Sequence, residues 1–232
     1  MTPYYEQDGI TIYHGDAYEV LPEIESIDLL VSDPPYVFGM KSNGNNGKGT
    51  GWSDLMNNAR LYAPLLREFK RVTAVRNGAA WVFTSWRSLP VLMRASLEAE
   101  WGIESLLVWD KGPEVGMGGP RGLRAQYELI ALYTHPEFRI ANRSTKDIWN
   151  VPWGGSSPRE FHPAQKPTSL LQRIIEVSGE GVVLDPFMGS GTTLVAARLL
   201  GRKAIGIEGE ERYCEIAAQR LSQGVLDFGG AP

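Results

Sequence analysis

The sequence D-P-P-Y at residues 33–36 places a carboxylate and an aromatic ring at the two ends of a stiff segment. Both prolines fix φ, keep the preceding residue extended and lack an N–H, so the segment offers acceptors rather than donors. Asp33 and the carbonyl of Pro34 are therefore suited to accept both hydrogens of an amino group on a planar heterocycle. Tyr36 is suited to stack on the face of that ring. A strand-ending turn with a capping aspartate is the alternative for a lone D-P-P-Y.

Residues 27–31 before this segment form an apolar run, interrupted by Asp28, that predicts a buried strand. D-P-P-Y then lies at a strand's carboxyl end, where open α/β sheets bind ligands. Residues 39–53 follow it, are rich in glycine and asparagine, and show no periodicity. They predict a mobile loop that serves either as a flexible linker or as a lid over the substrate.

A second stretch with chemical potential, D-P-F-M-G-S-G-T-T at 185–193, joins a predicted strand to a predicted helix. Gly189 and Gly191 permit a tight turn that a ligand can approach, and the helix that follows presents free N–H groups to the turn. The third glycine of a dinucleotide fingerprint and the Gly-Lys-Ser/Thr of a P-loop are both missing. Glu208 ends the next predicted strand, where an acid can accept hydrogen bonds from both hydroxyls of a ribose. The stretch predicts a site that binds an adenosine but has no loop that binds a diphosphate.

The sequence H-P-A-Q-K-P at 162–167 lies just before the predicted helix at 168–177, which in turn precedes the predicted strand at 182–185. Lys166 is placed to reach a carboxylate in the same pocket, and a surface turn is the alternative.

Predicted strands and helices alternate along the chain, which is typical of an α/β domain with a largely parallel sheet. The predicted strands are residues 10–13, 27–32, 79–84, 103–109, 128–133, 182–185 and 203–208. The predicted helices are residues 17–24, 54–72, 89–99, 168–177, 192–200 and 210–221. A glycine-rich stretch separates the strands at 103–109 and 128–133, so these two are expected to pair as a hairpin.

Length and composition fit one domain spanning residues 1–232, since 43% hydrophobic and 22% charged residues are typical of globular proteins. No apolar run reaches the ~18 residues of a membrane span, and the N-terminus lacks the features of a signal peptide. The single cysteine, Cys214, excludes an intrachain disulfide and a cysteine-rich metal site. We therefore expect a cytoplasmic protein with no membrane partner and no metal site.

The net charge of −4 is unevenly distributed, because residues 111–173 contain nine basic and five acidic residues whereas both ends are acidic. A solvated face explains such asymmetry, and a surface that faces phosphates is the alternative.

Taken together, D-P-P-Y, D-P-F-M-G-S-G-T-T, H-P-A-Q-K-P and the acid after the following strand resemble the motifs of S-adenosylmethionine-dependent DNA amino-methyltransferases. W-D-K at 109–111 and E-L-I-A-L-Y at 128–133 are similar to the intermediate strands of that family, so the resemblance covers most of the chain. D-P-P-Y comes first and the glycine turn last, which is the permuted order called the β class. The resemblance implies a Rossmann-like seven-stranded sheet, mostly parallel with one antiparallel strand, in a circularly permuted motif order.

The resemblance also implies roles for individual residues. The catalytic corner is Asp33, Pro34, Pro35 and Tyr36. The S-adenosylmethionine site consists of Asp16, His162, Lys166, Thr168, Asp185, Pro186, Phe187, Gly189, Gly191, Thr192, Thr193 and Glu208. Within it, Asp16 is expected near the adenine, and His162, Lys166 and Thr168 at the methionine end.

One departure from the family concerns residues 134–161, the candidate target-recognition region, which is shorter than family members usually have. Recognition of a sequence in double-stranded DNA is therefore expected to depend on this short region, on residues 39–53, or on a second subunit in a homodimer.

The implied reaction is site-specific methylation of adenine N6 in DNA, with the target base flipped out of the stack. The nearest alternative is N4 of cytosine, for which serine in place of Asp33 is more typical. An RNA or a protein amide as substrate is a further alternative, although glutamine methyltransferases resemble N-P-P-Y instead. The missing third glycine argues against a nicotinamide dehydrogenase, and the modest basic charge argues against a DNA-binding module without enzymatic activity.

Overall fold

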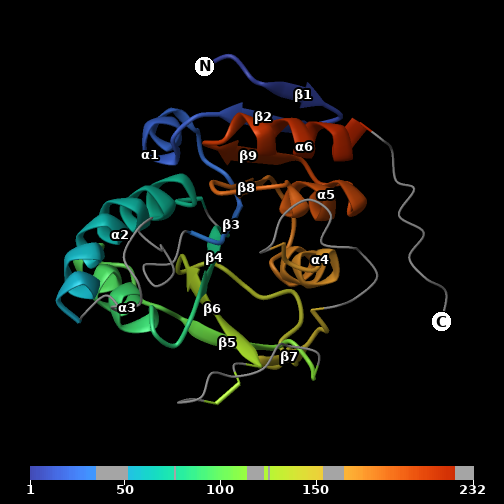
Figure 1. Cartoon of the computed structure of the whole chain (residues 1–232). Helices are drawn as coiled ribbons and strands as arrows, with labels where there is room; N and C mark the ends of the chain where they lie inside the picture. Colours follow the sequence, from blue (N-terminus) through green and yellow to red (C-terminus); the bar gives the residue numbers. More distant parts are fainter. Residues whose placement is uncertain (35–51, 76, 114–122, 125, 154–164, 223–232) are drawn as a thin grey trace.

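A nine-stranded sheet with the order β1-β2-β9-β8-β3-β4-β6-β5-β7 runs through the part of the chain that the structure describes (Figure 1). This structure is a computed structural model, and it describes residues 1–34, 52–75, 77–113, 123–124, 126–153 and 165–222, with the backbone alone for 52–61. The strands are β1 Tyr5–Gln7, β2 Ile10–His14, β3 Leu29–Ser32, β4 Ala79–Thr84, β5 Ser105–Asp110, β6 Tyr127–Thr134, β7 Ile148–Asn150, β8 Val183–Asp185 and β9 Ala204–Glu208. The helices are α1 Ala17–Val20, a 3₁₀ turn Leu21–Glu23, α2 Trp52–Val72, α3 Leu89–Glu98, α4 Thr168–Val177, α5 Thr192–Leu199 and α6 Glu211–Ser222.

The mostly parallel α/β sheet predicted from the sequence is confirmed, and the predicted number of seven strands is wrong by two. The seven expected strands are all of those between the two edge strands of the sheet, β1 and β7. Among them, β6 runs antiparallel to both of its neighbours, β4 and β5. The expected hairpin is therefore the β5–β6 pair. The additional strands, β1 and β7, lie at the two edges and have three residues each. Three residues are too few to show an alternating pattern in the sequence.

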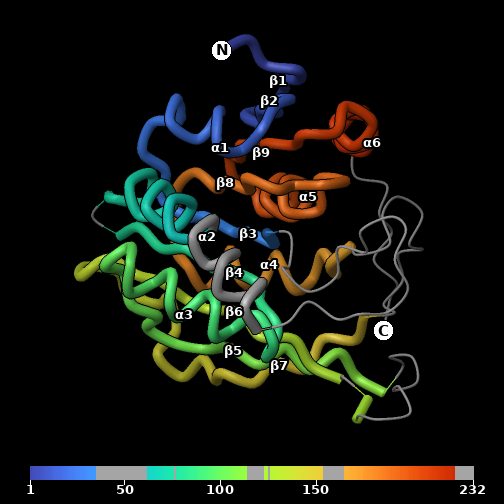
Figure 2. The backbone as a smooth tube through the Cα atoms, turned by 60° about the vertical axis from the view of Figure 1, so that its left-hand side comes forward, coloured from blue at the N-terminus to red at the C-terminus, as the bar shows by residue number. Residues whose placement is uncertain are grey.

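Helices cover both faces of the sheet, with α1, α2 and α3 on one face and α4, α5 and α6 on the other (Figures 1 and 2). Each helical layer closes a hydrophobic core of its own against the sheet. This explains why every residue of β3 and of β4 is buried, since a strand covered on both faces needs no polar side. Cys214 is one of the buried residues of the second layer, as its place in a predicted helix suggested.

The connections reverse direction between β8 and β3, which are paired in parallel with Leu30 opposite Leu184. From β8 the chain passes through α5 to β9 on one side, and from β3 it passes through α2 to β4 on the other side. The carboxyl ends of the two strands carry Asp185 and Asp33. Open α/β sheets bind ligands at such a point of reversal, so the fold brings the two chemical stretches of the sequence together.

Asp28, the polar residue that interrupts the apolar run at 27–31, holds this pairing in place. Its Oδ2 accepts a hydrogen bond of 2.7 Å from the backbone N–H of Val182, at the start of β8. Gly181 has φ of 115°, and a Cβ there would lie 2.1 Å from the Asp28 carboxylate. A larger residue at 181 would therefore separate the two strands.

Several element boundaries agree with the sequence prediction, and β4 and α4 agree at both ends. Helix α2 begins at Trp52, so the prediction that residues 52 and 53 belong to a mobile loop is wrong. The rest of that loop lies outside the described residues. The candidate target-recognition region 134–161 contains β7, and its residues 154–161 also lie outside the described part. Within the described residues, no helix combines the length and the apolar character that a membrane crossing requires.

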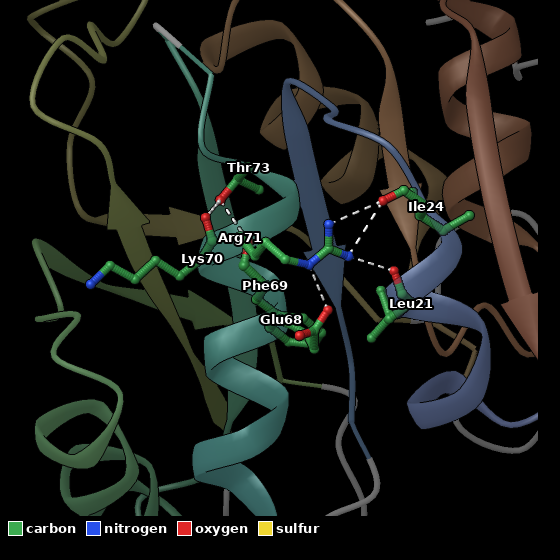
Figure 3. Close-up of polar contacts among 7 residues, drawn as sticks. All are labelled: Leu21, Ile24, Glu68, Phe69, Lys70, Arg71 and Thr73. Atoms are coloured by element: carbon green, nitrogen blue, oxygen red, sulfur yellow. Dashed lines mark hydrogen bonds and ion pairs between the residues drawn. The ribbon is translucent and has the colours of Figure 1, made fainter.

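Arg71 at the end of α2 fastens this helix to the segment that leads into β3 (Figure 3). Its guanidinium donates a hydrogen bond of 2.7 Å to the carbonyl of Leu21 and bonds of 3.3 Å to the carbonyl of Ile24. Its Nε also pairs with Glu68 at 2.8 Å, in a partly exposed ion pair. The two carbonyls belong to the turn after α1, so Arg71 fixes the direction from which the chain enters β3.

Replacing Arg71 with methionine is expected to lower the free energy of unfolding by about 1–3 kcal/mol, because two part-buried carbonyls lose a charged donor. Glu68→Gln is the matched control and is expected to change it by less than about 0.5 kcal/mol, since a partly exposed ion pair contributes little. Urea unfolding measures both. Equal losses would show that the ion pair, and not the carbonyl contacts, stabilises this junction.

Candidate active site

A cavity of about 1120 Å³ lies at the carboxyl ends of the central strands. Ligand pockets usually have about 300–1,000 Å³, so the cavity has room for more than one small molecule. It is lined from both chemical stretches of the sequence, by residues at the end of β3 and by residues of the turn after β8. The predicted site residues that line it are Asp33, Pro34, Lys166, Asp185, Phe187, Gly189, Thr192, Thr193 and Glu208.

Other predicted site residues do not line the cavity or cannot be placed. Asp16 caps α1, where its Oδ1 accepts a hydrogen bond of 2.8 Å from the N–H of Tyr18. Thr168, Pro186 and Gly191 are likewise absent from the cavity lining. The predicted residues that lie outside the described part of the chain are Pro35, Tyr36 and His162.

The glycine turn has the left-handed backbone that its two glycines permit, with φ of 50° at Gly189 and 78° at Gly191. The two positions differ in their surroundings. A Cβ on Gly189 would meet nothing within 4 Å, so this backbone is open to a ligand. A Cβ on Gly191 would lie 2.7 Å from the Cβ of Ala217, so Gly191 allows α6 to pack closely against the turn.

Two carboxylates hold the turn from below. Asp185 accepts hydrogen bonds from the N–H of Phe187 at 3.1 Å and from the hydroxyl of Thr193 at 2.5 Å. Burial raises the pKa of Asp185 to about 7, although both hydrogen bonds act in the opposite direction. Glu208 accepts from the N–H groups of Gly189 at 2.9 Å and of Glu210 at 2.8 Å. Each Glu208 oxygen retains a lone pair, so the carboxylate can still accept hydroxyl donors.

Asp33 has two carboxylate oxygens in different surroundings. Its Oδ2 lies 2.7 Å from Nζ of Lys166. Its Oδ1 is buried and has no hydrogen-bond partner among the described residues. A buried acceptor without a donor is unfavourable unless a ligand supplies the donor. Asp33 thus has one acceptor without a donor in the described part of the chain, and both Asp33 and the buried Pro34 line the cavity.

The structure adds two charged residues that the sequence interpretation did not assign to the site. Glu128 on β6 lies 3.1 Å from Nζ of Lys166 and 2.8 Å from Nζ of Lys111. Both Glu128 and Lys111 line the cavity. The sequence analysis treats W-D-K and E-L-I-A-L-Y only as strand sequences. The predicted hairpin between these strands nevertheless indicates that Lys111 and Glu128 lie close together. An antiparallel pairing brings the end of one strand beside the start of the next, so it places W-D-K next to the glutamate of E-L-I-A-L-Y.

Aromatic and basic side chains surround the remainder of the cavity. The rings of Trp109 and Trp153 stack with centroids 5.3 Å apart. After β4, Trp86 is 57% exposed, and the guanidinium of Arg87 lies 5.2 Å from the centre of its ring. Together with residues at the start of β6, this forms a rim of the cavity, which we define as Trp86, Arg87, Leu123, Arg124 and Tyr127.

The comparison with protein families decides the class to which this site belongs. A family model described as DNA methylase, for N6/N4 methyltransferases, matches residues 27–219. The chain belongs to this DNA methylase family. The resemblance inferred from the motifs to S-adenosylmethionine-dependent DNA amino-methyltransferases is thereby confirmed.

Individual relatives match along almost the whole chain. The type II methyltransferase M2.LlaDCHI from Lactococcus lactis subsp. cremoris is 30% identical, in an alignment that covers 96% of this chain and 93% of the relative. DNA adenine methyltransferase YhdJ from Escherichia coli (strain K12) is 29% identical, with 91% of this chain and 82% of the relative covered. The solved complex of M1.HpyAVI with SAM has a TM-score of 0.67 and 27% identity, and covers 91% of this chain and 98% of that one.

S-adenosylmethionine fits the cavity of this DNA methylase family member. The open backbone at Gly189 accommodates a close ligand, Glu208 retains acceptors for a ribose, and Phe187 offers an apolar contact. The volume leaves room for a base beside the cofactor. When bound, the cofactor supplies a methyl group on a positively charged sulfur.

Glu208→Gln tests the ribose contact and is expected to weaken binding of S-adenosylmethionine by about 1–3 kcal/mol, through the loss of charged acceptors. Calorimetry on the protein without DNA measures the dissociation constant. Glu210→Gln is the control, because Glu210 lines the same cavity and only its backbone N–H contacts Glu208. Equal affinity in wild type and Glu208→Gln would remove Glu208 from the cofactor site.

Proposed function

We propose that this protein is a site-specific DNA methyltransferase that transfers a methyl group from S-adenosylmethionine to N6 of adenine. The observation that supports it most strongly is Asp33, which lines a cavity shared with the glycine turn and whose buried Oδ1 has no hydrogen-bond partner among the described residues. An acceptor at this place is suited to the N–H of an amino group.

The protein has two tasks toward the base. A base within the duplex is out of reach, so it must leave the stack, which costs a few kcal/mol. Its amino nitrogen is then a poor nucleophile, because the lone pair is delocalised into the ring. Hydrogen bonds from the two N–H groups to Asp33 and to the Pro34 carbonyl favour a pyramidal nitrogen with a localised lone pair.

Positioning supplies most of the remaining rate. Two reactants held about 3–3.5 Å apart and aligned gain several kcal/mol over reactants free in solution. The glycine turn and Asp33 line one cavity, at the ends of two strands that are paired side by side, which supports this arrangement. The chain uses no nucleophile of its own in this mechanism, since the nitrogen receives the methyl group directly as the carbon–sulfur bond breaks. The methylated nitrogen then gives up one N–H proton to its hydrogen-bond acceptor.

Adenine is favoured over cytosine by the residue at position 33. Within the family, serine at this position is more typical of enzymes that act on cytosine N4, and this chain has Asp33. The relative YhdJ is named as a DNA adenine methyltransferase. Methylation of N4 of cytosine is the second candidate.

Asp33→Ala is expected to abolish methyl transfer and to leave the affinity for S-adenosylmethionine within about twofold, because Asp33 contacts the base and not the cofactor. Asp33→Asn keeps the shape and is expected to lose about 3–4 kcal/mol of transition-state stabilisation, as when an aimed electrostatic group is removed.

Single-turnover assays on double-stranded DNA, followed by digestion to nucleosides, measure both rate and product. N6-methyladenine from the wild type supports the proposal. N4-methylcytosine would show that the target base is cytosine and not adenine. Near wild-type transfer by Asp33→Ala would overturn the assigned role of the corner.

We also propose that DNA approaches along the rim. It combines two arginines with exposed aromatic and aliphatic side chains at the mouth of the cavity, and this composition suits phosphates and an unstacked strand. In contrast, the basic residues Arg139 and Arg143 of the candidate target-recognition region do not line the cavity. A homodimer that supplies further recognition, and a cytoplasmic location, remain predictions.

Arg87→Ala combined with Arg124→Ala is expected to reduce the slope of log affinity against log salt by up to about 2, since each phosphate contact contributes about 0.9. The double variant Arg139→Ala with Arg143→Ala removes the same charge elsewhere and is expected to leave the slope nearly unchanged. Fluorescence anisotropy with labelled duplex measures both slopes. The opposite ranking would move the DNA surface to the 134–161 region.

A further inference from the structure

We propose that a buried chain of alternating charges fixes the orientation of Asp33, so that Oδ1 faces the substrate amino group. In this chain Lys166 and Glu128 are positioning residues and do not bind the cofactor. The inference rests on the proposed function, because it concerns the same amino group. The chain of charges runs in the order Lys111, Glu128, Lys166 and Asp33.

The contacts between these groups are short and sequential. Nζ of Lys166 lies 2.7 Å from Oδ2 of Asp33 and 3.1 Å from Oε1 of Glu128. The other oxygen of Glu128, Oε2, lies 2.8 Å from Nζ of Lys111. Each of the two inner groups therefore pairs with opposite charges on both sides. Charge-assisted contacts of this length are the strong class of hydrogen bond.

Burial restricts the chain, because little water reaches Lys166, Glu128 and Lys111 to replace a lost partner, whereas Asp33 at the cavity end is 28% exposed. The side chains of Lys166, Glu128 and Lys111 are 9%, 7% and 14% exposed. Two positive and two negative groups alternate, so the set is neutral, and removing one member leaves an uncompensated buried charge. Burial alone lowers the pKa of Lys166, but the carboxylates of Asp33 and Glu128 outweigh it and raise the pKa above its ordinary value.

Aromatic rings hold the outer lysine in place. Nζ of Lys111 lies 4.1 Å from the ring centre of Trp153 and 5.1 Å from that of Trp109. The two rings stack on each other, and the backbone N–H of Trp153 donates to the carbonyl of Lys111 at 3.0 Å. The far end of the charge chain is thus fixed by cation–π contacts and by the backbone.

The consequence for Asp33 follows from the difference between its oxygens. A carboxylate free to rotate presents either oxygen. Here rotation would break the contact between Oδ2 and Nζ of Lys166. The side chain of Lys166 is only 9% exposed, so little water is available to replace the lost partner. Oδ1 is therefore left as a buried acceptor with no partner among the described residues, on a side chain that lines the cavity and whose orientation the ion pair fixes. Such preorganisation is what an aimed acceptor requires.

The fold supplies Glu128 and Lys111 from a different region than the catalytic corner. In the β5–β6 hairpin, Trp109 is opposite Glu128, and the backbone N–H of Lys111 donates to the carbonyl of Gln126 at 2.9 Å. Lys166 comes from the segment just before α4. Three chain segments therefore meet behind Asp33, and each contributes one charge.

This assignment differs from the one that the motif resemblance implies, in which Lys166 holds the methionine end of the cofactor. The two assignments make opposite predictions. A cofactor ligand affects the dissociation constant of S-adenosylmethionine, whereas a positioning residue affects the rate of transfer at saturation.

The experiment compares Lys166→Met, Lys166→Arg and Glu128→Gln with the wild type. Calorimetry gives the Kd for S-adenosylmethionine without DNA, and single-turnover kinetics at saturating DNA and cofactor give the rate. We expect a Kd within twofold of wild type in all three variants. The rate is expected to fall about a hundredfold in Lys166→Met, the loss that a misplaced reacting group typically causes. Lys166→Arg keeps the charge and is expected to recover part of it.

Glu98→Gln is the matched control for Glu128→Gln. It also removes a carboxylate charge from an ion pair, with Arg94 at 3.0 Å, but on the exposed surface of α3. We expect a wild-type rate for Glu98→Gln and a rate at least tenfold lower for Glu128→Gln. Equal rates in these two variants would overturn the inference.

A cycle with Lys111→Met guards against variants that fail to fold. If Lys111 acts only through Glu128, the double variant Lys111→Met with Glu128→Gln is no slower than Glu128→Gln alone. Independent, additive losses would overturn the chain as a unit. A Kd raised tenfold or more in Lys166→Met, with the rate at saturation preserved, would make Lys166 a cofactor ligand. The Kd comparison needs no turnover, so it decides this point even if the wild type methylates no base, a result that would contradict the proposed function instead.

Discussion

The parallel pairing of β3 with β8 is the contact on which the site depends. These strands are about 150 residues apart in the sequence; β8 ends in Asp185, and Asp33 directly follows β3. Their connections leave in opposite directions, so neither crossover helix of the described chain passes over the carboxyl ends between them. Asp28 and Gly181 set this pairing through a carboxylate-to-backbone hydrogen bond and a close approach that admits no Cβ. Asp28, which interrupts the apolar run at 27–31, therefore aligns the two strands whose ends line the cavity.

Local patterns in the sequence predicted what depends on local physics. Strand β4 is apolar up to its last residue and α4 has apolar residues at helical spacing, and both were predicted at their true ends. The three-residue edge strands were missed, because their pairing partners and not their own composition make them strands. Asp16 was assigned to the cofactor by resemblance, although an aspartate directly before a short helix is equally the signal of an N-cap.

The candidate site follows the same division. Motifs predicted that Asp33, Asp185 and Glu208 belong together, and the cavity contains all three. The partners of Lys166 were not predictable from its own neighbourhood, because Asp33 and Glu128 come from two other strands. A lysine beside a proline suggests little by itself. Its buried position between two carboxylates is a tertiary fact, determined by how α4 and the β5–β6 hairpin pack on the sheet.

The order of β3 and β8 along the chain has a consequence for synthesis on the ribosome. The proposed catalytic corner leaves the exit tunnel early, whereas β8, the glycine turn and Glu208 are among the last described residues to be made. Until then, one edge of β3 lacks its neighbour β8, and the backbone donors and acceptors of that edge must find water or a temporary partner. A nascent chain shorter than about residue 208 thus has β3 and β4 but no pocket for the cofactor. Premature termination in this region would leave an unpaired sheet edge, prone to aggregation, and not a partially active enzyme.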